Sequence, residues 1–391
     1  MMAATYEAYL TAFAALPVKF HGGYFGGIGM RLDEIDKNFV VKRPNDKPDT
    51  QWFDSCGEPF EIYGLLKPTE KDGFLRMPRD VAQTVNSGVY GLCRNTAGGR
   101  VRFATDSPYI AISSVMEGIS RLPHMAATGV HGFDLYVNYN GKDVFVSSFF
   151  PDIDITDGYS SYINVSTELG SGMREYTINF PLYNSVKSLA IGIKQGSRIE
   201  HGRKYRPLNP IVYYGSSITQ GACAIRPGMS YESLISRRFE VDYINLGFSG
   251  NAKGEPQMAE YIAGLPMSVF VCDYDHNAAN KTDLENTHFK FYEIIREKNP
   301  EIPYIMISRP NVFGAWKDSN ERKRVIEESC NKARARGDKN VYFIDGAELF
   351  AGADSFECTV DGCHPNDLGF YRMASRIGDA LEKILLDKGW I

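Results

Sequence analysis

The sequence predicts an α/β protein in which an antiparallel β-sandwich precedes a doubly wound, five-stranded parallel α/β/α sheet. Up to about residue 206, apolar residues come in short, often alternating runs, which is the pattern of strands. From Pro207 onward, apolar runs alternate with amphipathic stretches, as in a parallel sheet covered by helices on both faces. A chain of 391 residues exceeds what one hydrophobic core usually organises, so we expect two domains, at residues 1–206 and 207–391.

The clearest turn signal in the first half is Asn140-Gly141, inside "DLYVNYNGKDVFVS". A two-residue turn between antiparallel strands requires positive φ at both central residues, and Asn and Gly tolerate it best. We therefore predict a hairpin at this point, within a jelly-roll-like sandwich that follows an N-terminal helix.

The second half reads as five strands and the helices between them. The predicted strands are residues 211–214, 243–246, 268–273, 304–308 and 341–344, and the predicted helices are 231–239, 284–298, 319–336 and 367–386. In a doubly wound sheet, ligands bind beyond the carboxyl ends of the strands. Polar residues that directly follow these strands are therefore the candidates for chemistry.

The charge pattern argues against a nucleic-acid partner. The net charge is −5, and the densest basic stretch, residues 321–339, interleaves acids with bases at helical spacing. Phosphate recognition requires a concentrated basic surface, and the sequence has none. This stretch is typical of a solvated helix face.

Cysteine usage and hydropathy suggest a cytoplasmic protein. The seven cysteines are scattered, odd in number and without a CxxC pair, which is typical of reduced thiols. The N-terminal residues lack the cationic leader and clean apolar stretch of a signal peptide, and no segment approaches the length of a membrane span.

A serine pair follows the first predicted parallel strand, in "YYGSSITQGA" at residues 213–222. A serine hydroxyl is a weak nucleophile, so catalysis requires a histidine within hydrogen-bond reach and a carboxylate that orients the histidine. Without those partners, Gly215-Ser216-Ser217 is an ordinary turn between a strand and a helix.

His364 is the best of seven candidate histidines. It lies in "VDGCHPNDLG", after the last strand, with Asp361 three residues upstream, so that one ring nitrogen can meet the carboxylate while the other faces the cleft. His276, at the end of the third strand, is the closest rival. His288 lies within a predicted helix, where a surface or packing role is favoured.

Acyl transfer also requires donors for the negative charge that develops on the carbonyl oxygen. The second strand leads to "GFSGNA" and the third to "DYDHNAAN", which offer the backbone N–H of Gly250 and the side-chain amide of Asn277. With the N–H of Ser217 they would supply three donors. Arg226 is a candidate substrate contact, although a surface salt bridge explains it equally well. No spacing of His and carboxylate residues predicts a metal site.

These blocks resemble those of the SGNH hydrolases, also called GDSL-like esterases and lipases. "GSSITQG" resembles the nucleophile block with Ser217 at the serine position, "NLGFSGN" the glycine block with Gly250, and "DGCHP" the last block with Asp361 and His364. The resemblance implies a flavodoxin-like catalytic domain. This chain has Ser216 where the family usually has an acidic residue, and its third block reads "DYDHN".

A second motif, "GFDLY" at residues 132–136, resembles the signature of a β-rich domain that precedes a subset of these hydrolases. In a strand, successive side chains face opposite sides. We expect Phe133 and Leu135 on one side and Asp134 and Tyr136 on the other, so that the motif secures the sandwich and its contact with the hydrolase domain.

The resulting hypothesis is a serine esterase that removes short acyl groups, with acetyl groups on carbohydrates as the leading substrate. Ser217 would attack, His364 would act as base and acid, and Asp361 would orient His364. One alternative is a lysophospholipase or general lipase. Another is a carbohydrate-binding protein with a vestigial esterase site, whose candidate glycan-binding aromatics are Trp52, Tyr109, Tyr136 and Tyr139.

We expect no cofactor, no metal, and no nucleic-acid or membrane partner. The expected partner is a small-molecule or glycan ester substrate. The sequence leaves open whether the chain forms a homo-oligomer.

Overall fold

The computed structural model describes residues 35–36, 40–69, 71–170, 172–310 and 318–391. The chain divides into two compact units, Met1–Val41 and Lys42–Ile391, and the elements below belong to the second. The predicted N-terminal helix lies outside the described residues. Of the helices in the described residues, none has the length and apolar character needed to cross a membrane.

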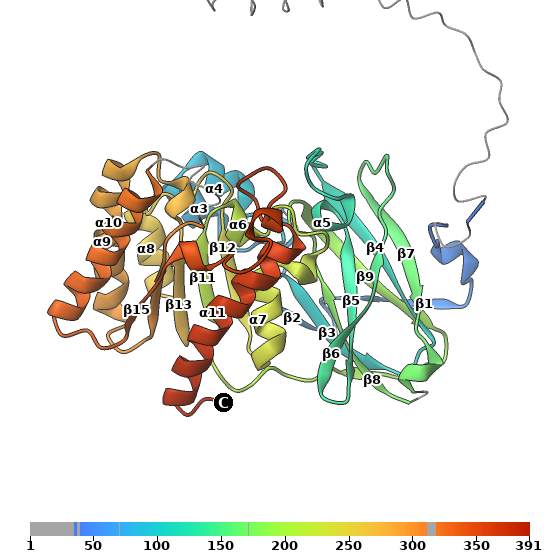
Figure 1. Cartoon of the computed structure of the whole chain (residues 1–391). Helices are drawn as coiled ribbons and strands as arrows, with labels where there is room; N and C mark the ends of the chain where they lie inside the picture. The colour runs from blue at the N-terminus through green and yellow to red at the C-terminus, as the bar shows by residue number, and fades with distance from the viewer. Residues whose placement is uncertain (1–34, 37–39, 70, 171, 311–317) are drawn as a thin grey trace, which may run out of the picture. The chain divides into compact units, whose positions relative to one another are not determined.

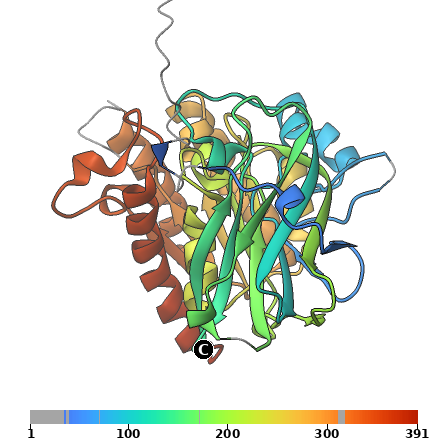
Figure 2. The same cartoon turned by 90° about the vertical axis from the view of Figure 1, so that its right-hand side faces the viewer.

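Two antiparallel sheets form the first part of the larger unit (Figures 1 and 2). Their strand orders, among the described residues, are β1-β9-β4-β7 and β10-β3-β8-β5-β6, with β2 paired to β3. Alternating side chains from both sheets, such as Phe103, Ile112, Phe133 and Ile191, are fully buried in one core. The predicted antiparallel sandwich is confirmed. The strands are β1 (Thr50–Asp54), β2 (Glu61–Tyr63), β3 (Arg100–Thr105), β4 (Tyr109–Glu117), β5 (Phe133–Tyr139), β6 (Lys142–Phe149), β7 (Gly158–Asn164), β8 (Arg174–Asn179), β9 (Ser185–Lys194) and β10 (Ile199–His201).

The predicted hairpin is present between β5 and β6. Asn140 and Gly141 have φ of +53° and +79°, the left-handed conformation that such a turn requires. The strands pair from Tyr139 opposite Lys142 to Phe133 opposite Phe149. The turn sets the pairing next to it, and a register shift between Leu135 and Tyr136 then separates that pairing from the pairs of Phe133 and Leu135, which are buried in the sandwich core.

The second part is a five-stranded parallel sheet in the order β12-β11-β13-β14-β15, as predicted. Because successive side chains alternate, Tyr213 packs in the core on one face of the sheet and Tyr214 in the core on the other. The strand order reverses next to β11, so its carboxyl end, with the serine pair, lies at the switch point. The strands are β11 (Ile211–Gly215), β12 (Tyr243–Gly247), β13 (Val269–Asp273), β14 (Tyr304–Ile307) and β15 (Val341–Ile344).

Helices cover both faces of the parallel sheet (Figure 1). The four predicted helices are present, with ends within three residues of prediction: α7 (Tyr231–Phe239), α9 (Lys281–Lys298), α10 (Ser319–Ala335) and α11 (Asp367–Asp387). Side chains of α9 and α10 share one core with α8 (Pro256–Ala263), and those of α7 and α11 share the other.

Among the described helices of six residues or more, three were not predicted: α8 in the second half of the chain, and two short helices that lie among strand-like runs in the first half. In α3 (Arg79–Val85) and α4 (Ser87–Leu92), Ala82 and Val89 are fully buried against the parallel sheet's core rather than in the sandwich. The first half of the chain therefore contributes to the core that supports the candidate site. The proposed domain boundary at residue 206 stays a prediction.

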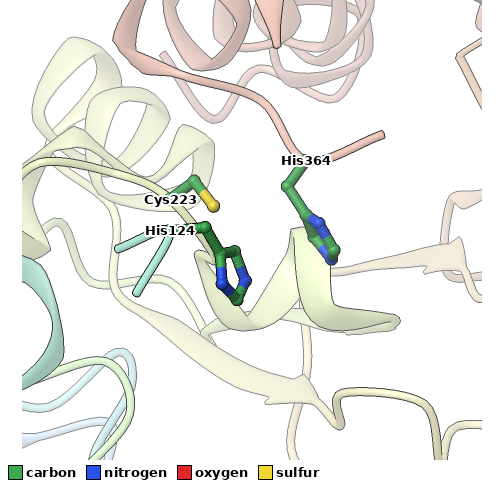
Figure 3. A group of neighbouring side chains, drawn as sticks. All are labelled: His124, Cys223 and His364. Carbon is green, nitrogen blue, oxygen red and sulfur yellow. The ribbon is translucent and has the colours of Figure 1, made fainter. Parts of the chain in front are cut away.

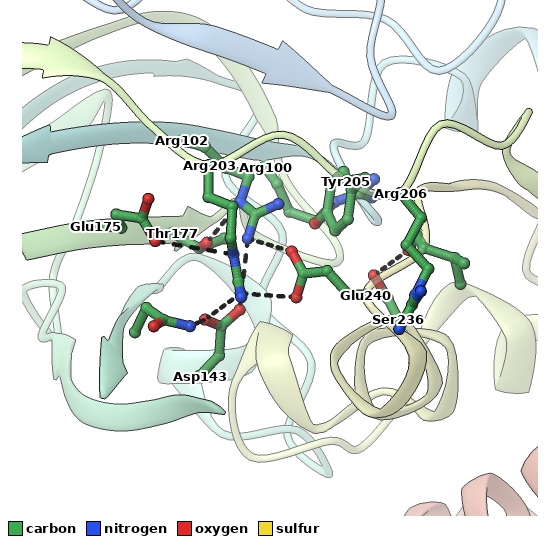
Figure 4. A network of polar contacts seen from close by, with 12 residues as sticks. Arg100, Arg102, Asp143, Glu175, Thr177, Arg203, Tyr205, Arg206, Ser236 and Glu240 are labelled. Carbon is green, nitrogen blue, oxygen red and sulfur yellow. Dashed lines mark hydrogen bonds and ion pairs between the residues drawn. The ribbon is translucent and has the colours of Figure 1, made fainter. Parts of the chain in front are cut away.

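An ion-pair network joins the antiparallel part to the turn between α7 and β12 (Figure 4). Glu240, which ends α7 with a left-handed φ of +54°, accepts from Arg102 and Arg203, each at 2.7 Å. Arg203 also donates to Asp143 of β6 at 3.1 Å. Because the Arg102 side chain is only 3% exposed, its bonds to Glu240 and Thr177 replace part of the water that the guanidinium loses.

Candidate active site

Ser217 is the first residue of the short helix α6 (Ser217–Gln220), directly after β11. The hydroxyl of Ser216 accepts the backbone N–H of Ile218 at 3.1 Å and so caps this helix. The Ser217 Oγ lies 2.9 Å from Nε2 of His364. The two adjacent serines therefore have different contacts. Ser216 is fully buried and caps the helix, whereas the Ser217 hydroxyl contacts His364.

Asp361 orients the histidine ring. Its Oδ2 lies 2.7 Å from Nδ1 of His364, and its Oδ1 accepts the backbone N–H groups of His364 and Cys363 at 2.8 and 3.0 Å. Burial alone would raise the pKa of Asp361, but the hydrogen bonds from His364 and Cys363 outweigh it and lower the pKa to about 2. The ionised carboxylate favours the proton on Nδ1, which leaves Nε2 to accept from the Ser217 hydroxyl.

The loop that carries this pair is held at both ends. The backbone N–H of Val360 donates to the carbonyl of His364 at 2.9 Å, and Gly362 takes a φ of +82° at the turn between them. The side chain of Asn366 then caps α11 by accepting the N–H of Gly369 at 3.1 Å. These hydrogen bonds hold Asp361 and His364 in one turn.

The rival histidines occupy other environments. Nδ1 of His276 lies 3.9 Å from the sulfur of Cys363, and burial, with the positive charge of Arg309, lowers the His276 pKa to about 3. His288 is buried within α9 and stacks on Tyr274, so it packs in the core as expected. Of the three, His364 is the one that meets Ser217.

The predicted oxyanion donors lie on neighbouring loops. Gly250 has a φ of +68° that favours glycine, and the preceding N–H of Ser249 donates to Oε1 of Gln220 in α6 at 3.0 Å. The backbone N–H groups of Ser217 and Gly250 have no hydrogen-bond acceptor among the described residues. Asn277 donates one side-chain N–H to the Phe248 carbonyl at 2.9 Å, which ties its amide to the loop of Gly250.

Arg226 contacts the antiparallel part of the structure. Its guanidinium lies 3.2 Å from Oδ2 of Asp134, bonds the hydroxyl of Tyr136, and stacks 3.7 Å above the Phe145 ring. Within the described residues, the hydrogen bonds and ion pair of Arg226 go to Asp134 and Tyr136 rather than to Ser217 or His364. The salt-bridge interpretation of Arg226 thus matches its contacts, and a role in substrate binding stays a prediction.

The "GFDLY" motif joins the two parts, as its alternation predicted. Asp134 is fully buried and accepts from Asn179 of β8 at 2.7 Å and from the backbone N–H of Gly228 at 2.8 Å. Gly228 lies just before α7, beside Arg226. The motif's charged side chain thus secures the segment that leads from α6 to α7.

Two of the candidate glycan-binding aromatics are core residues. Tyr136 is 3% exposed and Tyr109 is 2% exposed, so neither can stack on a sugar at the surface. Trp52 and Tyr139 are 40% and 45% exposed. Tyr136 is buried because Arg226 and Arg237 pack over its ring. Tyr139 reaches solvent because it is the last residue of β5, next to the hairpin turn.

Two side chains beside the site were not predicted. The His124 ring, from the segment between β4 and the short helix α5 (Ala127–Val130), lies 5.8 Å from the His364 ring, centroid to centroid. Cys223 follows α6 with a left-handed φ of +71°. Ligand atoms of His124, Cys223 and His364 lie within 4.8 Å of one another (Figure 3). No sequence signal connects residues so far apart in the chain.

Comparisons with known proteins place this geometry in a family. The sequence profile of the GDSL-like lipase/acylhydrolase family matches residues 208–385, and the GxDLY profile, the N-terminus of SGNH-hydrolase-type esterases, matches residues 50–199. A Bacteroides ovatus protein described as a GDSL-like lipase is 31% identical, with a TM-score of 0.76 over 86% of this chain and 98% of its own. The chain belongs to the GDSL-like, or SGNH, hydrolase family. It is an SGNH-type esterase or acylhydrolase.

More distant structures share the fold of this SGNH hydrolase. The salicylyl-acyltransferase SsfX3 of a tetracycline biosynthetic pathway is 19% identical, with a TM-score of 0.70 over 86% of this chain and 99% of its own. A family two carbohydrate esterase from Clostridium thermocellum is 15% identical, with a TM-score of 0.57 over 86% of this chain and all of its own. No curated protein sequence matches this SGNH hydrolase.

Proposed function

We propose that this SGNH hydrolase is a carbohydrate esterase that removes acetyl groups with a Ser217–His364–Asp361 triad. The observation that carries the proposal is the hydrogen-bonded chain from the Ser217 hydroxyl to His364 Nε2 and from His364 Nδ1 to Asp361. A serine, a base and an orienting carboxylate in contact are the requirement for nucleophilic acyl transfer.

In the first step, Ser217 Oγ attacks the ester carbonyl carbon while its proton moves to His364 Nε2. The backbone N–H groups of Ser217 and Gly250 and the second amide hydrogen of Asn277 would bind the oxyanion that forms on the carbonyl oxygen. His364 then gives the proton to the leaving alcohol, which departs and leaves an acyl group on Ser217.

In the second step, His364 removes a proton from water, which attacks the acyl-serine carbon. The carboxylic acid departs, the proton returns to Ser217 Oγ, and the site is restored. Asp361 stays ionised throughout, because hydrogen bonds hold its pKa near 2, and it stabilises the positive charge on His364 in both steps.

The carbohydrate substrate is supported by the arrangement of the whole chain. Family two carbohydrate esterases and an acetyl xylan esterase from Butyrivibrio proteoclasticus match 86–88% of this chain, so they share both its antiparallel part and its parallel sheet. The alternative is a lysophospholipase or general lipase, which requires room for a long acyl chain.

The dependence of kcat/KM on the length of the acyl chain distinguishes an acetyl esterase from a lipase. We expect kcat/KM on p-nitrophenyl esters to fall from acetate to butyrate to decanoate, and acetylated xylo-oligosaccharides to release acetate. The Ser217→Ala variant is the blank for both assays. A rise in kcat/KM toward decanoate, or hydrolysis of lysophosphatidylcholine without deacetylation of sugars, would overturn the acetyl-sugar proposal.

A further inference from the structure

Three side chains from distant segments form a group that could bind a metal next to the proposed triad. His124 comes from the antiparallel part, Cys223 from the turn after α6, and His364 from the loop before α11 (Figure 3). Their ligand atoms all lie within 4.8 Å of one another. Two imidazoles and a thiolate are ligands that suit Zn²⁺, whereas Mg²⁺ and Ca²⁺ require oxygen ligands.

We propose that Zn²⁺ binds to His124, Cys223 and His364 and inhibits the enzyme by occupying Nε2 of the catalytic histidine. The inhibitory part rests on the proposed function of His364, whereas the binding site itself does not.

The hydrogen bonds of His364 identify the nitrogen that would bind the metal. Nδ1 is engaged by Asp361 at 2.7 Å, so Nε2 is the atom that can coordinate an ion. A carboxylate that accepts from the other ring nitrogen is the usual outer partner of a zinc-bound histidine. Because the same Nε2 lies 2.9 Å from Ser217 Oγ, a bound ion would take the lone pair that has to accept the serine proton.

The other two ligands have the placement that such a site needs. Cys223 is buried beside the loop that carries His364. Its backbone has a left-handed φ of +71°, which residues other than glycine rarely adopt. Ligand atoms around a tetrahedral Zn²⁺ lie about 3.5 Å apart, so the group has to close by about 1 Å. His124 is exposed and can supply that movement by rotation of its side chain. A fourth position would be left to water.

Proton balance follows from the chemistry of the thiol. A cysteine binds zinc as the thiolate, so Cys223 has to give up its thiol proton when the ion binds. Binding forms a Zn–S bond and releases that proton to the buffer. No oxidant or reductant takes part.

The test measures binding and inhibition separately. Isothermal titration calorimetry with ZnCl₂ would give the affinity, and Co²⁺ in place of Zn²⁺ would give the visible bands of a tetrahedral site with a thiolate charge-transfer band in the near ultraviolet. Turnover of p-nitrophenyl acetate would be followed with ZnCl₂, and with MgCl₂ as the control ion. Spontaneous and metal-catalysed hydrolysis would be subtracted with the Ser217→Ala variant.

We expect one zinc ion per chain and loss of turnover as it binds. His124→Ala and Cys223→Ser should weaken zinc binding at least as much as the roughly tenfold loss that follows removal of an outer-shell partner. Both variants should turn over ester in the presence of zinc that stops the parent protein. His201→Ala is the matched control, because His201 is an exposed histidine on β10 paired to Glu58.

The outcomes are distinguishable. Absence of zinc binding, equal affinity in the two ligand variants and the parent, or full activity of the zinc-loaded enzyme would each overturn the proposal. Ser217→Ala should bind zinc normally, because Ser217 is not a ligand. An inactive parent that still binds zinc through His124 and Cys223 would reject the proposed esterase function and leave the metal site standing.

Discussion

Asn277 donates its side-chain amide to the carbonyl oxygen of Phe248 across 2.9 Å, and so joins the loop after β13 to the loop that carries Gly250. The contact fixes the amide plane and uses one of its two hydrogens. The second hydrogen is the one that the proposed mechanism assigns to the oxyanion. The irregular third sequence block, "DYDHN", therefore still presents an oriented amide.

Replacement of Asn277 by Ala should lower kcat on p-nitrophenyl acetate by roughly 10²–10³-fold with a small change in KM, because an oxyanion donor acts mainly in the transition state. Steady-state kinetics measure it. Asn280→Ala is the control, since Asn280 caps α9 and should cost about 1 kcal/mol of stability without lowering kcat. Equal kcat in the parent and Asn277→Ala would remove Asn277 from the mechanism.

The two adjacent serines should respond differently to removal of their hydroxyls. Ser217→Ala should lose roughly 10⁴-fold or more of kcat, as nucleophile variants of serine hydrolases do. Ser216→Ala removes a helix cap and should lower the free energy of unfolding by about 1 kcal/mol while turnover is retained. Kinetics and urea denaturation of both variants check this, and the reverse pattern would make Ser216 the nucleophile.

Asp273 predicts a dependence of stability on pH. It is buried at the end of β13, and burial, together with the charge of Asp275, raises its pKa to about 8 from an ordinary 3.8. Between pH 4 and 8 the folded state thus binds a proton that the unfolded state has lost, so this group's contribution to stability falls as pH rises. The Asp273→Asn variant has an amide at this position, which does not ionise, so its stability lacks this pH-dependent contribution.

The difference in unfolding free energy between Asp273→Asn and the parent should therefore shift in favour of the variant as pH rises from 5 to 8. Urea denaturation at several pH values measures it, with Asp379→Asn on the surface of α11 as control. A difference that stays constant with pH would show that Asp273 is ionised across the whole range.

Glu240 should contribute strongly to stability. Its removal leaves the buried Arg102 without its 2.7 Å partner, and loss of one member of a buried ion pair costs about 3–5 kcal/mol. Glu240→Ala should lower the free energy of unfolding by about 3 kcal/mol in urea. Glu293→Ala, which breaks the half-exposed pair with Arg336, should cost about 1 kcal/mol or less. Similar losses in both variants would contradict this role.

Local patterns in the sequence were sufficient for much of this structure. Alternation and helical periodicity gave the five parallel strands and four of their helices, because burial of one face imposes a period on the chain. Asn140-Gly141 predicted its hairpin because a two-residue turn requires positive φ at both positions. Asp361 and His364 were predictable as a pair because they lie three positions apart in one turn.

The sequence by itself determined the order of the elements, the family, and which residue types reach the carboxyl end of the sheet. Only the tertiary structure decided which serine meets His364, that Arg226 bonds Asp134, that α3 and α4 pack on the parallel sheet, and that His124 and Cys223 lie beside the site. The physical reason is distance along the chain. Periodicity reports only a residue's own neighbours, whereas these contacts join segments that folding alone brings together.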